Sequence, residues 1–189
     1  FVDGLLVSRA FGFNQGFDVF DEKTKNIINK DFDVKMKKVN AWMDSRKSKK
    51  PFFLFIHTYD AHEPFKPSEE ALRQLPQMPS KKFFNLEEII SILKLKEPKF
   101  DFDYVTQLYE AGFYDVDKKL GEFFQKLKTD KLMQNTVVIL TADHGEELGE
   151  HGNWAVHGFQ LYNEVLHVPL IYYAPNSVVK KIKSPVSLV

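Results

Sequence analysis

Residues 136–154 read TVVILTADHGEELGEHGNW, and this stretch decides how the rest of the chain is interpreted. It opens with the apolar run from Val137 to Leu140, which is typical of a strand buried on both faces, as in parallel sheets. Asp143 and His144 follow where that strand is predicted to end. Ligands of open α/β sheets bind beyond the carboxyl ends of the strands, and an Asp oxygen beside a His nitrogen suits a divalent metal ion.

An Asp-His-Gly alone is also an ordinary way to end a strand, because Asp and Gly are turn formers. A second apolar run, Phe52 to Ile56, has a similar continuation that contains His57, Asp60 and His62. Two strands that both end in His and Asp favour a shared site at one edge of the sheet. His157 lies before a third predicted strand, Val168 to Tyr173, and is a further candidate for that edge.

Helices are predicted between these strands. The segments 32–50 and 103–128 both carry apolar residues at helical spacing. Shorter helices are predicted within 68–75 and 85–96, each after a Ser or Asn that suits a helix cap. The strand, helix, strand order implies right-handed crossovers, so we expect an α/β fold with a mostly parallel sheet flanked by helices.

Composition limits the functional classes. The 189 residues suffice for one domain with its own core, and the equal numbers of basic and acidic residues, 26 each, provide no field for nucleic acid. The absence of Cys excludes disulfides and thiolate ligands from this chain. No apolar run has the length of a membrane span.

Three stretches together resemble the sulfatases of the alkaline phosphatase superfamily. They are PFFLFIHTYDAHEPF at 51–65, YEAGFYDVDKKLGEFFQKLK at 109–128, and TVVILTADHGEELGEHG at 136–152 with the HGFQLYNEVLHVPLIYYAP that follows it. The resemblance runs almost end to end. It implies that residues 1–189 form a single, partial catalytic domain of the alkaline phosphatase-like α/β class.

The resemblance also implies roles for four residues. Asp143 and His144 match the late pair of ligands for a divalent cation, commonly calcium, where many relatives have Asp-Asn. His62 matches the His of the H-x-P-F/Y element, which contacts the sulfate and can protonate the leaving group. His157 lies near the position of a Lys that binds a sulfate oxygen, which makes it the second catalytic candidate.

Two departures from the family pattern qualify these roles. The early Asp-Asp metal pair is absent, and so is the C-x-P-x-R or S-x-P-x-R element whose Cys or Ser becomes formylglycine. Two ligands are too few for calcium, which takes six to eight oxygens, and the imidazole of His144 shifts the preference toward Mn²⁺ or Zn²⁺. We therefore expect a central-to-late piece, without the nucleophile region and the C-terminal end, that is inactive alone.

The implied activity of the parent protein is hydrolysis of a sulfate ester, either a small molecule or a glycan. A phosphate or phosphonate ester hydrolase, or a phosphotransferase, of the same superfamily is the first alternative. A non-catalytic relative that binds anions or glycans is the second. The resemblance favours a periplasmic or otherwise exported protein, whereas the sequence says nothing about its oligomeric state.

Overall fold

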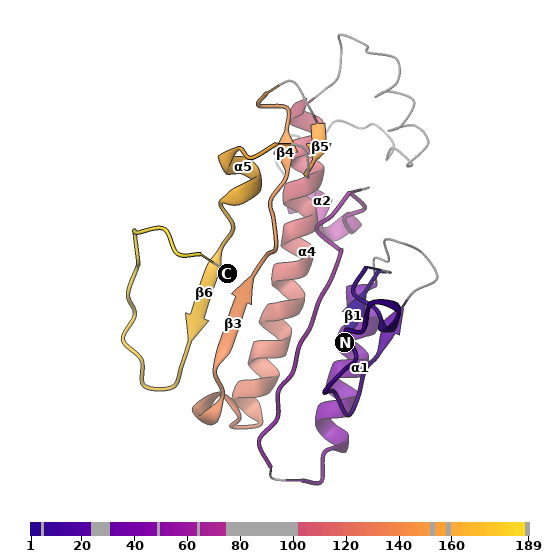
Figure 1. Cartoon of the computed structure of the whole chain (residues 1–189), viewed down its shortest axis with the longest axis vertical. Helices are drawn as coiled ribbons and strands as arrows, with labels where there is room; N and C mark the ends of the chain where they lie inside the picture. Colours follow the sequence, from indigo (N-terminus) through magenta and orange to yellow (C-terminus); the bar gives the residue numbers. More distant parts are fainter. Residues whose placement is uncertain are drawn as a thin grey trace.

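A computed structural model describes residues 1–4, 6–23, 31–48, 50–63, 65–74, 102–151, 154–157 and 160–187 (Figure 1). Its elements are, in chain order, β1 (Val2–Asp3), η1 (Arg9–Phe11), β2 (Glu22–Lys23), α1 (Phe32–Ser45), α2 (Glu69–Gln74), α4 (Phe102–Thr129), η2 (Met133–Asn135), β3 (Val138–Thr141), β4 (Glu147–Leu148), β5 (Trp154–Val156), α5 (Asn163–Leu166) and β6 (Leu170–Tyr173).

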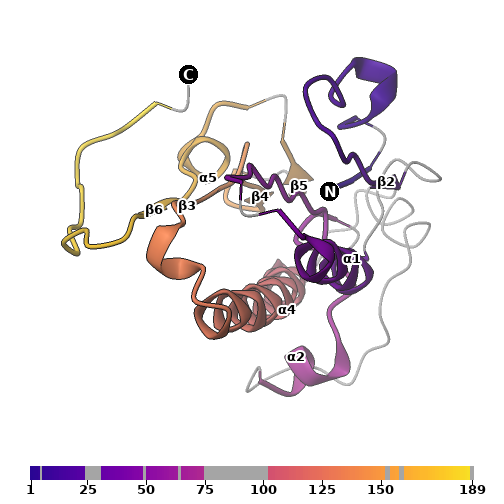
Figure 2. The same ribbon diagram turned by 90° about the horizontal axis from the view of Figure 1, so that it is seen from below.

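The two long helices form one layer. Figure 2 shows α1 and α4 next to each other, with the strands on one side of them. Their contact is the hydrophobic core, in which α1 contributes residues at helical spacing and α4 contributes Phe123 and Leu127. Full burial of one such side chain stabilises the fold by roughly 1.5–3 kcal/mol. The buried residues of α1 in this core are Phe32, Met36, Val39 and Met43.

The helix predictions agree with the structure where it describes the chain. The predicted helices at 32–50 and 103–128 correspond to α1 and α4, and the one within 68–75 corresponds to α2. The predicted helix at 85–96 lies outside the described residues. Among the described helices, none has the length and apolar character that a bilayer crossing requires.

The segment 51–57 is extended but is not part of a regular sheet. Phe52, Leu54 and Ile56 pack against the helical core, whereas Phe53 and Phe55 point outward and are 74% and 44% exposed. The backbone of this segment forms two hydrogen bonds with Phe1. The Phe1 amino group donates to the Phe55 carbonyl oxygen (2.9 Å), and the Phe1 carbonyl oxygen accepts from the His57 N–H (3.0 Å). The predicted strand is therefore extended chain that is covered on one face.

The prediction of a mostly parallel sheet is wrong for the two later apolar runs. β3 and β6 pair antiparallel, with Val138 opposite Tyr173 and Thr141 opposite Leu170. A parallel pair needs a long crossover, usually a covering helix. Among the described residues between these strands, the one helix is α5, which has four residues, and the chain returns beside β3 in the opposite direction. The parallel pair that the structure does describe is β1–β2, which joins two residues of each strand.

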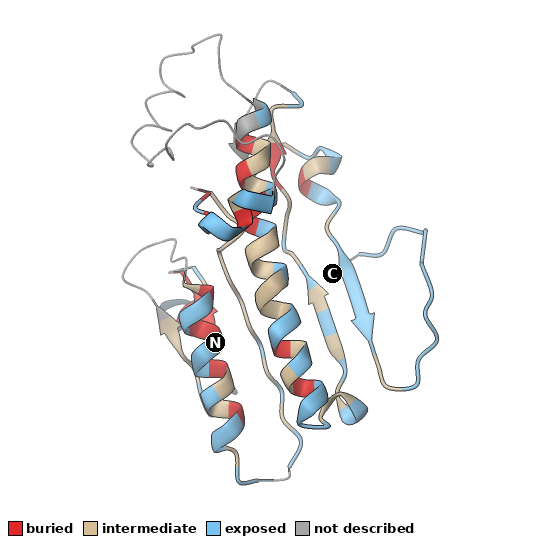
Figure 3. Cartoon of the chain, turned by 180° about the vertical axis from the view of Figure 1, so that it is seen from behind, coloured by how far each residue is buried: buried red, intermediate tan, exposed pale blue. Residues whose placement is uncertain are grey.

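One face of the strands is open in the part of the chain that the structure describes (Figure 3). Exposure alternates along β3, where Ile139 is 63% exposed, and all four residues of β6 are exposed. The run from Val137 to Leu140 was predicted to be buried on both faces, and the run from Val168 to Tyr173 was predicted to be a buried strand. The helices cover one face of the strands, because α1 and α4 lie in a single layer.

A buried ion pair links the N-terminal strand to this layer. Asp3 of β1 is 0% exposed and Lys35 of α1 is 3% exposed, and Lys35 Nζ lies 2.8 Å from Asp3 Oδ1. The same ammonium group donates to the Val2 carbonyl oxygen. Burying a carboxylate is costly unless a partner compensates its charge, so the position of β1 depends on Lys35.

Candidate active site

His62 lies in a turn that is attached to the start of α1. The His62 N–H donates to the Tyr59 carbonyl oxygen (2.9 Å) and closes this turn. The Asp60 carboxylate accepts a hydrogen bond from the Phe32 N–H, at 3.3 Å to either oxygen. Asp60 was predicted from the sequence to follow a strand near the site. In the structure its carboxylate pairs with the Phe32 N–H at the N-terminus of α1, where backbone N–H groups have no partner within the helix.

The loop after β3 is held in place by α5. The Gly145 N–H donates to the Val165 carbonyl oxygen (2.7 Å). A Cβ atom on Gly145 would overlap with the Glu164 carbonyl oxygen, so only Gly permits this approach of the two backbones. The contact sets the positions of both neighbours of Gly145, which are His144 and Glu146.

We predict that Gly145→Ala destabilises the fold by about 1–3 kcal/mol, the usual cost of inserting an atom into packed structure. Thermal or denaturant unfolding of the variant measures this loss. Gly121→Ala is the matched control, because a Cβ there meets no atom within 4 Å and Gly121 lies inside α4. The control should gain roughly 0.5–1 kcal/mol from its lower unfolded-state entropy. Equal stabilities of the two variants would contradict the close approach at Gly145.

His144 has the geometry of a metal ligand. Its Nδ1 lies 2.9 Å from the Gly145 carbonyl oxygen, and such a contact orients the ring and places the proton on Nδ1. Its Nε2 lies 3.8 Å from Asp143 Oδ2, a spacing that one metal ion can bridge. The Asp143 side chain is 80% exposed. These two residues fit part of a divalent-cation site, with one hard and one borderline donor.

The rings of His62 and His157 lie close to that of His144, which belongs to this loop. The ring centroids of His144 and His157 are 4.1 Å apart, and the rings are stacked at 15°. The His62 ring lies 4.9 Å from that of His157 and 6.4 Å from that of His144. The structure therefore brings together His62, His157 and the Asp143–His144 pair, as expected for a shared site, while their chemical roles stay predictions.

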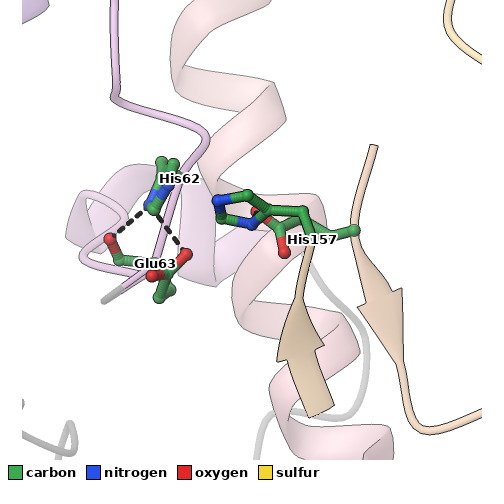
Figure 4. Close-up of side chains that lie close together, drawn as sticks. His62, Glu63 and His157 are labelled. Carbon is green, nitrogen blue, oxygen red and sulfur yellow. Dashed lines mark hydrogen bonds and ion pairs between the residues drawn. The ribbon is translucent and has the colours of Figure 1, made fainter. Parts of the chain in front are cut away.

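Two glutamates complete this group. Glu63 Oε2 lies 2.7 Å from His62 Nδ1, which also contacts the Glu63 carbonyl oxygen at 2.8 Å (Figure 4). Glu146 Oε1 lies 3.0 Å from His157 Nδ1. Each of the two histidines thus has its own carboxylate. We call His62, Glu63, Glu146 and His157 the His–Glu cluster.

Burial and ion pairing act against each other on the pKa values of these groups. Burial lowers the pKa of His62, but the contacts with Glu63 outweigh it, so the pKa is raised overall. Burial raises the pKa of Glu63, and the contacts with His62 reverse the shift to a net lowering. Both directions favour a charged His62–Glu63 pair near neutral pH. Burial dominates at Glu146 and raises the pKa of its carboxyl group.

We predict that Glu63→Gln lowers the pKa of His62, because the variant loses the charged side-chain contact that opposes the effect of burial. NMR titration of the His62 ring measures the midpoint. In the unaltered chain, the stability that the raised His62 pKa contributes is fully present below about pH 6.5, the ordinary pKa of His. It is lost as the pH rises through the higher pKa of the folded state. Glu63→Gln should reduce this dependence. Glu70→Gln, which breaks a surface pair with Lys118, should leave the His62 midpoint unchanged.

The two glutamates were not predicted from the sequence as members of the site. Glu146 was visible beside the Asp-His-Gly, and Glu63 directly follows His62, but adjacent carboxylates are usually solvated. The signal for Glu146 would be its burial, which only tertiary packing creates. His151 lies apart from this group: it stacks on Tyr162, with centroids 3.6 Å apart, and pairs with Glu164.

The sulfatase family model matches residues 3–189, so this chain belongs to the sulfatase family, which implies the alkaline phosphatase-like α/β fold. Human iduronate 2-sulfatase is 28% identical over 152 residues, which cover 68% of this chain and 27% of that protein. A sulfatase of Formosa agariphila is 36% identical over 85 residues, covering 44% and 16%. Dog arylsulfatase K is 34% identical over 80 residues, covering 42% and 15%.

The chain thus spans 27% or less of the length of each of these three relatives. No solved structure matches it significantly.

Proposed function

We propose that this chain supplies the metal-binding and proton-donating part of an active site that hydrolyses sulfate esters, within a longer polypeptide. The carrying observation is the convergence of His62, His157 and the Asp143–His144 loop in a chain of the sulfatase family. Curated relatives named iduronate 2-sulfatase and arylsulfatase K support sulfate over phosphate as the substrate group.

Asp143 and His144 would hold the divalent cation. The Asp143 carboxylate is accessible, and His144 Nδ1 is engaged with the Gly145 carbonyl, which directs Nε2 toward the same position. When bound, the cation neutralises charge on the sulfuryl oxygens. Calcium is proposed from the resemblance, with further oxygen ligands from outside these residues, whereas the imidazole donor admits Mn²⁺ or Zn²⁺.

His62 is the proposed general acid. The raised pKa increases the fraction of His62 rings that carry the proton at a given pH, and Glu63 keeps the ring oriented. A protonated imidazole can donate to the oxygen of the departing alcohol as the S–O bond breaks. His157 would then donate a hydrogen bond to a sulfuryl oxygen, with Glu146 positioning its ring.

The nucleophile does not come from these 189 residues, which contain no Cys and no S-x-P-x-R element. By resemblance it is a formylglycine elsewhere in the longer polypeptide. We therefore expect the 189-residue chain alone to release no sulfate from an aryl sulfate above background.

The test compares an aryl sulfate with the corresponding aryl phosphate as substrates of the longer polypeptide. Faster sulfate release supports the proposal. Faster phosphate release would assign the site to the phosphate ester alternative, and turnover of neither would favour the binding protein that lacks catalysis.

Metal analysis of the same polypeptide tests the assignment of the cation site. The variant Asp143→Ala should lose bound metal while far-UV circular dichroism stays unchanged, because Asp143 is exposed and follows β3. Undiminished metal content would remove Asp143 from the ligand set.

A further inference from the structure

The His–Glu cluster has the composition of a transition-metal site. One nitrogen or oxygen atom from each of its four residues lies within 4.8 Å of the atoms from the other three. In a four-coordinate zinc site, bonds of about 2.0–2.2 Å place the ligand atoms roughly 3.4 Å apart. Small side-chain rotations would bring the four atoms to that spacing. The cluster is separate from Asp143 and His144, although His144 stacks on His157.

A buried carboxylate oxygen without a hydrogen-bond partner is available to bind a cation. Glu146 is 8% exposed, and its Oε2 is buried without a hydrogen-bond partner, while its Oε1 contacts His157. A buried acceptor without a partner costs free energy, and a bound cation would remove that cost. Glu146 therefore offers a free acceptor beside three further metal-binding groups.

Charge balance also fits a dication. With both carboxylates ionised and both histidines neutral, the cluster carries two negative charges, which one divalent ion neutralises. Neutralising two buried carboxylates in this way lowers the cost of burying their charge.

We propose that His62, Glu63, Glu146 and His157 bind a transition-metal dication of the zinc class. Two imidazole nitrogens favour zinc, cobalt or manganese over calcium and magnesium, which prefer oxygen donors. A consequence rests on the proposed function: metal here occupies both proposed catalytic histidines, so zinc inhibits sulfate ester hydrolysis. The metal site itself does not depend on that function.

Cobalt(II) is the probe, because four-coordinate cobalt(II) with nitrogen and oxygen ligands absorbs visible light strongly enough to be measured. Titration of the metal-stripped 189-residue chain should produce this absorption at one equivalent, and zinc should displace it. Glu146→Gln keeps the side-chain shape and should weaken zinc binding at least ~10- to 100-fold, the loss typical of disturbed metal sites. His151→Gln removes the exposed His–Glu pair near α5 and should leave binding unchanged.

Histidine NMR of the unaltered chain provides a measurement that no folding defect of a variant can obscure. Diamagnetic zinc should shift the ring signals of His62 and His157 and leave those of His151 in place. Absence of four-coordinate cobalt absorption overturns the proposal. Absorption that survives Glu146→Gln but is lost in Asp143→Asn overturns it as well, because the metal then sits at Asp143 and His144.

Discussion

Lys35→Met should lower the free energy of unfolding by about 3–5 kcal/mol, the usual loss when one partner of a buried ion pair is removed. The substitution keeps most of the volume of the side chain and leaves the carboxylate of Asp3 buried without its 2.8 Å partner. It also removes the donor to the Val2 carbonyl oxygen. Denaturant unfolding measures the loss, and the full effect would be a large share of the stability of a small domain.

Two controls separate charge from packing in this prediction. Lys38→Met breaks an exposed pair with Asp21 and should cost at most about 1 kcal/mol. Adding Asp3→Asn to Lys35→Met removes the uncompensated charge and should recover part of the loss. If the double variant is no more stable than Lys35→Met, then packing rather than charge explains the effect.

The pH dependence of this loss has a definite sign. Burial raises the pKa of Asp3, and Lys35 opposes that shift. The folded state therefore binds a proton more readily than the unfolded chain, so stability falls as pH rises from about 3.9 through the folded-state pKa. Removing Lys35 should raise the pKa of Asp3 further. The deficit of Lys35→Met should accordingly be largest above that pKa and should shrink as the solution is made acidic.

His62→Gln should lower kcat of the longer polypeptide by about 10²- to 10⁴-fold with an alkyl sulfate, the range typical of general acid catalysis. An alkoxide is a poor leaving group and needs the proton that His62 supplies. A nitrophenolate leaves without protonation, so the loss should be much smaller with nitrophenyl sulfate. Steady-state kinetics with both esters measures the difference.

His151→Gln is the control for this experiment, because His151 pairs with Glu164 and stacks on Tyr162. It should affect neither ester. Equal losses of His62→Gln with the two esters would indicate that His62 binds the sulfate group and does not protonate the leaving oxygen.

Helix positions were predictable from the sequence, whereas strand burial was not. Met36, Val39 and Met43 recur at helical spacing, and their burial in α1 follows directly. In β3 the outward residue Ile139 is as apolar as its inward neighbours, so the run contains no alternation that would reveal an open face. The direction of β6 was equally hidden, since it depends on where the connection through α5 leads.

The candidate site was predictable in part, for a different reason. His62, Asp143, His144 and His157 follow strand ends or match family motifs, and both kinds of signal are local. The pairing of His157 with Glu146 joins residues from either side of the β4–β5 hairpin, and the neighbouring pair Glu63–His62 reaches it from another segment. No local sequence pattern predicts that these two pairs lie close together, because their proximity arises only when the segments pack against each other.

The hydrogen bond from Gly145 to Val165 makes the lifetime of the site depend on a four-residue helix. So short a helix has little intrinsic stability and can detach while α1 and α4 remain folded. Each detachment would release Gly145 and with it the orientations of His144 and Glu146. We expect the fraction of molecules with the assembled site to depend on such local opening, and a ligand that binds only the docked state should stabilise α5 as well.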